Sequence, residues 1–492
     1  MRNWLIAAIC LISWVPLLAQ QSTQPLPKQS PEQLQEDLRT LKKILEANHP
    51  SLYWYTPQHQ MDSVFNNALL QIRDSMNEIA FKNLVAAYIS QIKCGHTTVR
   101  NSKSFVKHFS KRPQLSFPLN IKVWDDSLVV INSLNPKDSV FTRGTKIIQI
   151  NGRTGRQFLD TFSPFISGDG PGTAFAYQLV SGNFGGFYRT IIGLDSAYHI
   201  TYINKQGIRA DTILHNFNPL SVNMSAESMA KIKMQRPSRR ELRIARREEK
   251  RQLRIDSTTQ TAYMRLGSFS GSGTAHFIKS SFRKIKNGNV QQLVIDVRTN
   301  GGGKVSNSTL LTQYISDHPF RVADSVVRNQ KGLEYGSRFQ QSWIYALGLL
   351  VTSRKQPDGR YHFSRFEKKI WKPKVKNHFS GPVYLVQGGY SFSAATLFLG
   401  ELKGQQNVKL VGEETGGGYY GNSAMMIPVC ILPNSGLKIS VPLYRLVINK
   451  DRPKGGGVLP DIYVPPSSEA IRKGVDAKME KIRSLIQQKA AF

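Results

Sequence analysis

The chain has 492 residues, 40% of them apolar, with 66 Lys and Arg against 33 Asp and Glu and a formal net charge of +33. This length predicts two to four domains, and the apolar content is ordinary for a globular protein with a sizeable core. The charge is compatible with nucleic acid, anionic lipid or an acidic polymer as partner, but no nucleic-acid motif accompanies it, so we expect a generally basic protein without a nucleic-acid partner.

The first residues predict a secretory signal peptide over 1–20. Arg2 is followed by an apolar stretch that runs to Ala19, which is too short for a membrane span and offers a small residue at the cleavage point. Cys10 lies inside this stretch, which argues against a lipoprotein anchor. We therefore expect a soluble, exported protein that is periplasmic or secreted.

Residues 21–110 predict a helical N-terminal domain. Leucines recur at helical spacing in "PEQLQEDLRTLKKILEANHP", and the His49-Pro50 pair ends that helix because a residue before proline avoids the α region. Two further amphipathic patterns follow, "MDSVFNNALLQIRDSM" and "AFKNLVAAYISQIK". The domain closes on "CGHTTV".

Residues 111–218 predict a small β-rich domain. Strand-like alternation in "LNIKVWDDSLVVINSL" and "TKIIQING" is separated by Asp-Asp and Asn-Gly turns. The stretch "RGTKIIQINGRTGRQFLDTF" resembles the inner strand pair of a PDZ domain and the helix that follows it.

Residues 219–258 predict a basic helical linker. It carries eleven Lys and Arg against four acids between Lys231 and Asp256, and Pro237 suits a first helical turn. A solvated connecting helix is the simpler interpretation, and a docking face for an anionic surface is the alternative.

Residues 259–466 predict an α/β core, because strand patterns such as "QQLVIDVRTN" and "GPVYLVQ" alternate with helical ones. Residues 467–492 predict a C-terminal helix with Val475, Met479, Ile482 and Ile486 on one face.

Two of the three cysteines, Cys94 and Cys430, lie outside the predicted leader, which is too few for a disulfide framework. The sequence contains no Cys/His cluster with zinc spacing and no HExxH motif, so we expect neither metal nor organic cofactor.

Three polar segments lie where strands or helices end, which is where α/β proteins gather ligands. The first, "DVRTNGGG" at 296–303, combines a strand end with three glycines before a helix. Free N–H groups there can hold an oxyanion, or the segment is only a flexible loop. Its spacing matches neither GxGxxG nor GxxxxGK[ST], which disfavours a nucleotide phosphate loop.

The second segment, "SFSAAT" at 391–396, lies at a strand-to-helix junction. Ser391 or Ser393 caps the helix, or one of them is a nucleophile whose developing charge the helix N–H groups stabilise. The N–H of Ala394 is then an oxyanion donor. The absence of GxSxG excludes an α/β-hydrolase elbow.

The third segment, "GHT" at 95–97, places His96 between a helix and a strand. It is either a structural histidine at a helix end or a base that accepts a serine proton.

These segments, with "GEETGGG" at 412–418 and "GVLPDIYV" at 457–464, resemble in order the motifs of the S41 peptidases, the C-terminal processing and tricorn-type proteases. The resemblance implies an α+β multi-domain fold: an N-terminal helical domain, a β-rich PDZ-like domain and an α/β core of the ClpP/crotonase-like type. It also implies peptide or protein substrates.

The resemblance further implies Ser393 as nucleophile, His96 as general base, and Gly302 and Ala394 as oxyanion donors. The lysine base of the tail-specific subgroup is absent, since Gly418 stands at its position. The glutamate expected before "GVLPD" is also absent, and Asp451 is the nearest acid that could orient His96.

The predicted function is an exported serine endopeptidase or processing protease that needs no cofactor. The alternatives are a catalytically impaired peptide- or lipid-binding protein on the same scaffold, and a basic protein that docks on anionic surfaces.

Overall fold

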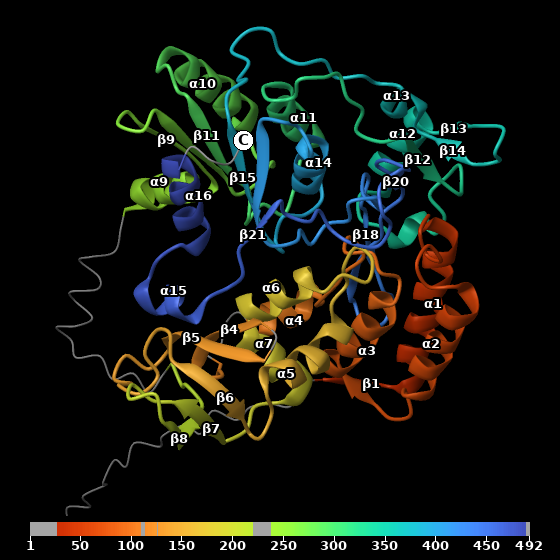
Figure 1. Cartoon of the computed structure of the whole chain (residues 1–492). Coiled ribbons are helices and arrows are strands. Elements are labelled where there is room, and N and C mark those ends of the chain that lie inside the picture. Colours follow the sequence, from red (N-terminus) through yellow and green to blue (C-terminus); the bar gives the residue numbers. More distant parts are fainter. Residues whose placement is uncertain (1–26, 110–113, 125, 220–237, 489–492) are drawn as a thin grey trace, which may run out of the picture.

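The computed structural model describes residues 27–109, 114–124, 126–219 and 238–488 (Figure 1). The predicted signal peptide and the first half of the predicted basic linker lie outside the described residues. Within the described ranges, no helix is both long enough and apolar enough to cross a membrane.

The three predicted N-terminal helices are confirmed as α1 (Pro31–Asn48), α2 (Gln58–Leu70) and α3 (Glu78–Ser90). Ser30 begins α1 with a capping box that it shares with Gln33, and the predicted leucine stripe is buried. Short elements β1 (Lys28–Gln29), β2 (Met76–Asn77), β3 (Val99–Arg100) and α4 (Lys103–Phe109) flank these helices.

The core of this helical region is shared with the C-terminal half of the chain. Cys430, Leu437 and Ile439 pack into the same cluster as Leu38 and Leu41. Two strands from that half, β18 (Val429–Ile431) and β19 (Lys438–Ser440), form a three-stranded sheet with β3. The segment that carries His96 is therefore fixed at both ends.

The predicted β-rich region is confirmed as a five-stranded antiparallel sheet in sequential order. Its strands are β4 (Leu119–Trp124), β5 (Ser127–Ser133), β6 (Lys146–Ile150), β7 (Ala197–Ile203) and β8 (Arg209–His215). A helical insertion that the sequence analysis did not predict precedes β7. After α5 (Gly155–Phe162) it comprises η1 (Ser163–Phe165), α6 (Ala174–Gly182), α7 (Phe184–Phe187) and η2 (Tyr188–Ile192).

The predicted α/β core is a six-stranded mixed sheet in the order β21-β16-β15-β11-β10-β9. The parallel strands are β10 (Thr261–Leu266), β11 (Gln292–Asp296), β15 (Val383–Gln387), β16 (Val408–Gly412) and β21 (Ile462–Tyr463). The prediction that the helical linker reaches residue 258 is wrong. Helix α9 ends at Lys250, and the chain continues as β9 (Arg251–Asp256), an antiparallel edge strand. Leu253 and Ile255 stand two residues apart and therefore share one face of this strand.

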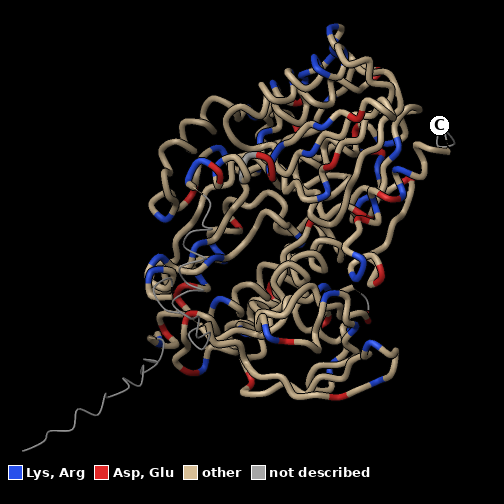
Figure 2. The backbone as a smooth tube through the Cα atoms, turned by 90° about the vertical axis from the view of Figure 1, so that its left-hand side faces the viewer, with Lys and Arg blue, Asp and Glu red and all other residues tan. Residues whose placement is uncertain are grey.

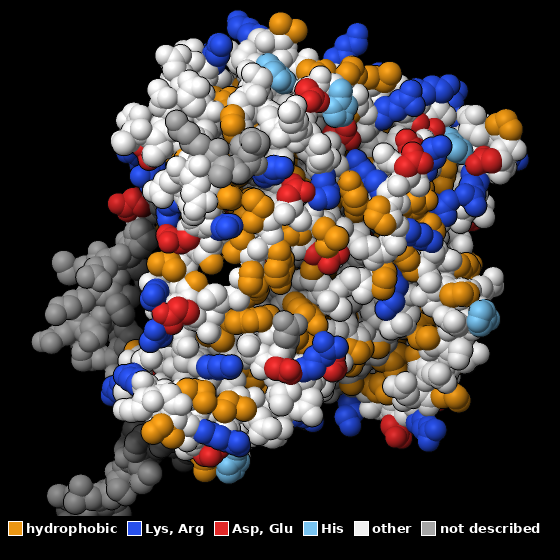
Figure 3. Space-filling view, viewed as in Figure 1, with side chains coloured by type: hydrophobic (Ala, Val, Ile, Leu, Met, Phe, Trp, Pro, Cys, Tyr) orange, Lys and Arg blue, Asp and Glu red, His pale blue; other side chains and the backbone are white. Residues whose placement is uncertain are grey.

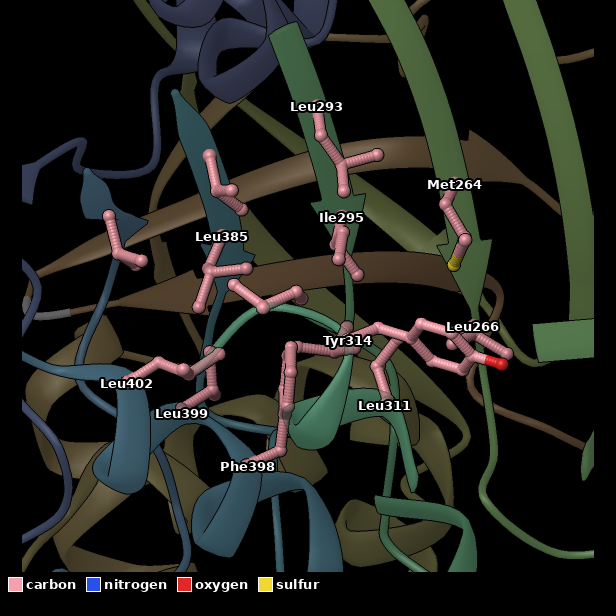
Figure 4. Packing of buried hydrophobic residues seen from close by; sticks show 14 of the residues in the cluster. Met264, Leu266, Leu293, Ile295, Leu311, Tyr314, Leu385, Phe398, Leu399 and Leu402 are labelled. Atoms are coloured by element: carbon pink, nitrogen blue, oxygen red, sulfur yellow. The ribbon is translucent and has the colours of Figure 1, made fainter. Parts of the chain in front are cut away.

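Helices cover both faces of this sheet. α10 (Thr274–Asn287), α11 (Val305–Gln313) and α14 (Ala394–Leu402) pack on one face, and Figure 4 shows side chains from β11 and β15 meeting those of α14, among them Ile295, Leu385 and Phe398. On the other face, Val294 and Val386 pack against α16 (Ala477–Gln488). The alternation along β11 follows from the two-residue period of a strand.

The predicted single C-terminal helix is wrong in one respect, because it is divided into α15 (Ser468–Lys473) and α16. Gly474 between them has φ +67, a left-handed conformation that ends a helix. Of the predicted apolar face, Ile482 and Ile486 are buried, whereas Val475 is 44% exposed.

A second sheet, β13-β14-β12-β20-β17, lies beside the core. Its strands are β12 (Ser325–Arg328), β13 (Arg354–Lys355), β14 (Tyr361–His362), β17 (Gly421–Asn422) and β20 (Arg445–Val447). Between them the chain forms η3 (Gly336–Arg338), α12 (Ser342–Thr352) and α13 (Ser364–Glu367). Figure 2 shows Lys and Arg positions spread over both halves of the molecule, so the described basic residues are not confined to α9 (Arg239–Lys250).

Candidate active site

Ser393 lies at the mouth of α14, directly after the β15 turn. Its backbone has φ 53 and ψ −121, a conformation that is rare for a residue with a side chain, and its hydroxyl makes no capping hydrogen bond to the helix. Strained residues of this kind are found at functional sites more often than elsewhere. The cap interpretation of Ser393 is therefore not supported by its geometry.

Ser391 has a structural role at the same junction. Its fully buried hydroxyl donates to the carbonyl of Val297 at 2.9 Å and accepts from the N–H of Gly388 at 3.3 Å. These bonds hold the β15–α14 turn against the end of β11. The sequence did not decide which of the two serines has a structural role, and their contacts assign that role to Ser391.

Two glycine loops enclose Ser393. A Cβ added to Gly302, whose φ is +100, would lie 2.7 Å from the Cβ of Ser393 and 3.1 Å from the amide nitrogen of Ala394. A Cβ on Gly417 would lie 3.0 Å from the amide nitrogen of Ser393. The triple glycines of both predicted motifs therefore allow backbone to approach the serine more closely than any side chain would permit.

The two amides predicted to hold an oxyanion differ in availability. Gly302 N–H donates to Oδ1 of the buried Asn300 at 2.9 Å, so this predicted donor is already engaged. Ala394 is the first residue of α14, and within the described ranges its N–H has no hydrogen-bond acceptor. Of the two predicted donors, the Ala394 amide is therefore the one that has no acceptor among the described residues.

His96 lies beside the residue that precedes Ser393. Its ring centroid is 5.1 Å from that of Phe392, and the Phe392 centroid is 4.7 Å from that of Phe175 in α6. A Cβ on Gly95 would lie 2.4 Å from Cζ of Phe392, which explains why glycine stands before the histidine. The fold thus brings together segments that are nearly three hundred residues apart.

The imidazole of His96 is not hydrogen-bonded to Ser393 in this state. Its side chain is 10% exposed, and among the described residues neither ring nitrogen has a hydrogen-bond partner. A proton relay needs a contact of roughly 3 Å, although such contacts are often loose in empty sites.

Asp169, rather than Asp451, is the acid that faces His96. Its buried carboxylate has Oδ1 3.7 Å from Nδ1 of His96, and it accepts the N–H groups of Gly95 at 2.9 Å and Gly418 at 3.4 Å. Asp451 instead lies exposed in a turn, where its N–H donates to the side chain of Asn449.

Sequence reasoning missed Asp169 because it lies in the loop between η1 and α6, within the β-rich region. The one local signal is "GDG", an acid between two glycines. Gly418, which occupies the position of the missing lysine, contributes its backbone N–H to this acid.

The ionisable groups His96, Asp169 and Cys94 shift one another's pKa. Burial lowers the pKa of His96, but the Asp169 carboxylate and the Cys94 thiol outweigh it and raise the pKa to about 10. Burial raises the pKa of Cys94, but His49 and His96 lower it to about 6. The 3.7 Å separation makes the contact with Asp169 an ion pair rather than a hydrogen bond. At neutral pH an imidazolium is therefore favoured here.

Cys94, His96 and Asp169 also have the donor types that bind zinc. Their potential ligand atoms all lie within 4.8 Å of one another. The same three groups satisfy one another as an ion-paired cluster, so the arrangement does not require a metal to balance its charge.

A groove of about 470 Å³ opens beside the β15–α14 turn, between the core, the β-rich region and α15. Gly389 and Tyr390 form one wall, and Tyr390 is held by a 2.7 Å hydrogen bond to the carbonyl of Gln178. Both signs of charge line it, from Lys122, Arg143, Arg298, Glu413 and Lys478.

Residues 260–464 match the family described as Peptidase family S41. No curated protein sequence matches the chain.

Among solved structures, mature CPAF superposes with a TM-score of 0.63 at 13% identity, covering 94% of this chain and 99% of that one. This likeness concerns the fold alone. The photosystem II D1 C-terminal processing protease, at 14% identity, covers 91% of this chain and 98% of its own, with a TM-score of 0.38.

Proposed function

Because residues 260–464 belong to peptidase family S41 and the chain is a peptidase, we propose that it cleaves peptide bonds with Ser393 as nucleophile and His96 as general base. The observation that carries the proposal is the strained Ser393 at the mouth of α14, enclosed by two glycine loops and one residue from the ring that contacts His96. The proposal is supported by three groups of the described residues near this serine: the His96 imidazole, the Asp169 carboxylate and the Ala394 amide.

In the proposed reaction the Ser393 oxygen attacks the scissile carbonyl carbon while its proton passes to His96. The carbonyl oxygen becomes an oxyanion, which the N–H of Ala394 and the N-terminal end of α14 stabilise. His96 then gives the proton to the leaving amine, and an acyl ester on Ser393 remains. Water, deprotonated by His96, cleaves that ester and restores both side chains.

Asp169 takes the orienting role for which Asp451 was the predicted candidate. Its carboxylate holds the Gly95 amide and faces Nδ1 of His96, which leaves Nε2 to face the nucleophile. A buried negative charge next to Nδ1 stabilises the imidazolium that forms during attack. The same charge delays loss of the proton from the resting enzyme, since it raises the pKa of His96.

Formation of the His96–Ser393 hydrogen bond is proposed to accompany substrate binding. Phe392 lies between Phe175 and the imidazole, so a small rotation of these rings changes the distance between base and nucleophile. A substrate in the groove beside Gly389 and Tyr390 would contact the same turn. We infer that a bound peptide, by contacting this turn, brings His96 and Ser393 together and so completes the site.

We also propose that the protein acts outside the cytoplasm, as a periplasmic or secreted processing protease. The support is the predicted signal peptide at 1–20. The β-rich region, proposed to act as a PDZ-like domain, would hold an extended peptide by strand addition.

A serine-directed covalent reagent tests the nucleophile. A fluorophosphonate is expected to label the wild-type chain and Ser391→Ala, because the Ser391 hydroxyl is fully buried, and to leave Ser393→Ala unlabelled. Peptide turnover by Ser393→Ala should fall by roughly 10⁴-fold or more. Labelling that persists in Ser393→Ala and disappears in Ser391→Ala would refute the assignment.

One observation favours a second candidate, a catalytically impaired peptide- or lipid-binding protein. Among the described residues His96 has no hydrogen-bond partner, and its pKa is raised to about 10, so a neutral base is scarce at pH 7. No labelling by the reagent at pH 7 or at pH 10, together with peptide binding, would establish this candidate instead.

A further inference from the structure

Helix α12 presents an apolar face to solvent. Trp343 is 69% exposed, Leu347 56% and Leu350 70%, and these positions recur at helical spacing. Ile344 and Val351, at 45% and 70%, widen the same face. We call these five residues the α12 face. Single exposed apolar residues are common on proteins, but five on one helix mark an interaction surface.

The opposite side of α12 is fixed to the protein. Leu349 is buried in a cluster with Val326 and Leu443, and the hydroxyls of Thr352 and Ser353 lie 2.8 and 2.7 Å from that of Tyr444. The helix is therefore held in one orientation, and its apolar face is not the result of detachment from a core.

Exposed basic side chains follow α12 in the chain, on elements that lie in the same part of the molecule (Figure 1). Residues 342–369 contain six Lys and Arg and two acids. All six basic residues are exposed: Arg354, Lys355, Arg360, Arg365, Lys368 and Lys369. We call these six residues the basic rim. Figure 3 shows Lys and Arg gathered on the part of the molecule that carries α13 and the β13–β14 hairpin.

The two acids of this segment do not offset the basic rim fully. Asp358 and Glu367 lie 3.0 and 2.9 Å from the two ring nitrogens of His362. Glu367 also accepts the N–H of Val326. Their charges are thus turned toward one histidine, His362, at the end of β14.

We propose that the α12 face and its basic rim bind the surface of an anionic lipid bilayer, with α12 lying in the plane of the interface. A helix with exposed Trp, Leu and Ile on one side and Lys and Arg around it has the composition of interfacial helices. Tryptophan favours the headgroup level, and cations are attracted to anionic headgroups. At 11 residues α12 does not span a bilayer.

The charge of the rim favours a bilayer over a second copy of the chain as the occupant. In a two-fold dimer through the α12 face, each basic rim would approach its own equivalent, and like charges brought together oppose association. An anionic bilayer has negative headgroups, which attract the basic rim. Its apolar acyl chains can take up the exposed side chains of the α12 face.

Quenching of Trp343 by brominated lipids tests insertion without using catalysis. The full chain is mixed with vesicles of phosphatidylglycerol and phosphatidylcholine that carry bromine on the acyl chains. The chain has six tryptophans, so the signal of Trp343 is the difference between wild type and Trp343→Phe. We expect a clear difference, in which the signal of Trp4 and Trp14 within residues 1–20 cancels because both chains carry them.

Two variants test the face and its rim separately. Leu347→Gln/Leu350→Gln should weaken the Trp343-dependent binding roughly tenfold or more. Arg365→Gln/Lys368→Gln/Lys369→Gln should weaken it on the order of 100-fold at low salt. The matched control is Arg239→Gln/Arg240→Gln/Arg243→Gln, which removes equal charge from the exposed face of α9 and should leave the Trp343 signal unchanged.

Three results would overturn the proposal. The first is equal quenching in wild type and Trp343→Phe. The second is binding that only the α9 variant abolishes, which would assign anionic-surface contact to α9. The third is a dimer in solution that Leu347→Gln/Leu350→Gln converts to monomer while vesicle binding is absent, which would make the α12 face a contact between copies.

Discussion

Asp169 holds the turn that carries His96. Its carboxylate accepts the Gly95 N–H at 2.9 Å and lies 3.7 Å from Nδ1 of the imidazole, and a second amide, from Gly418, reaches it at 3.4 Å. One buried acid therefore joins the helical region, the β-rich region and the α/β core at the point where the proposed base meets the proposed nucleophile.

The pH dependence of turnover should follow from this ion pair. Only the neutral imidazole accepts a proton, and Asp169 with Cys94 raises the pKa of His96 to about 10. Turnover per molecule should therefore be low near pH 6.5 and rise as the pH increases toward 10, as His96 loses its proton. Measurement of kcat/KM from pH 6 to 10 checks this.

Asp169→Asn separates the two effects of that carboxylate. Loss of the negative charge lowers the pKa of His96, so the rising limb of the profile should move to lower pH. Loss of orientation and of imidazolium stabilisation should lower the plateau by about 10²- to 10⁴-fold. Asp451→Asn, at the exposed turn, is the control and should leave both limb and plateau unchanged. A shift in Asp451→Asn alone would return the orienting role to that residue.

The sequence located the elements that short-range patterns encode. The leucine stripe of α1 and the alternation of β4 and β5 predicted their elements. The junctions where strands end drew attention to the glycine loop at 296–303 and to the serine pair at 391–393, and the family resemblance then singled out Gly302 and Ser393. Glycine at a strand end and serine before a helix are local signals with a direct physical cause.

The features that sequence patterns failed to predict depend on contacts between distant segments. Asp169 has no local signal beyond its flanking glycines, and only the folded chain brings it to His96. Residues 251–256 continue a charged helical pattern in sequence, but pairing with β10 makes them a strand. The sequence patterns gave no prediction for α12, whose apolar side chains are mostly exposed in the structure.

Gly302→Ala should abolish activity with a moderate loss of stability. A Cβ there would lie 2.7 Å from the Cβ of Ser393, and φ +100 is unfavourable for alanine, so the backbone must shift where the nucleophile lies. We expect a loss of about 1–3 kcal/mol in the free energy of unfolding, measured in urea, and a loss of covalent labelling.

The control for that substitution is its neighbour. Gly301→Ala meets nothing within 4 Å and is not in the left-handed region. It should keep labelling and stability close to wild type. Equal damage in both variants would mean that loop flexibility, rather than the close approach to Ser393, is what the glycines provide.

Gly95→Ala tests the contact that sets the position of His96. Its Cβ would lie 2.4 Å from Cζ of Phe392, so either the turn or the ring must move and turnover should fall. Phe392→Leu removes the clashing ring atoms. The double variant Gly95→Ala/Phe392→Leu should therefore be more active than the product of the two single effects predicts. Additive effects would show that the two residues do not act through their contact.

Phe398→Ala should destabilise the packing that holds α14, the helix that carries the nucleophile. Phe398 is fully buried in the cluster that joins α14 to β11 and β15, and its ring lies 6.2 Å from that of Phe269. Loss of the ring leaves a cavity and should cost about 3–5 kcal/mol in the free energy of unfolding. Val375→Ala, at 98% exposure, is the control and should change stability by less than about 0.5 kcal/mol.

Because α14 carries both Ser393 and the Ala394 amide, labelling of Phe398→Ala should decline at lower urea than that of wild type. Labelling that outlasts the loss of the core signal would mean that the β15–α14 turn keeps its geometry without this packing.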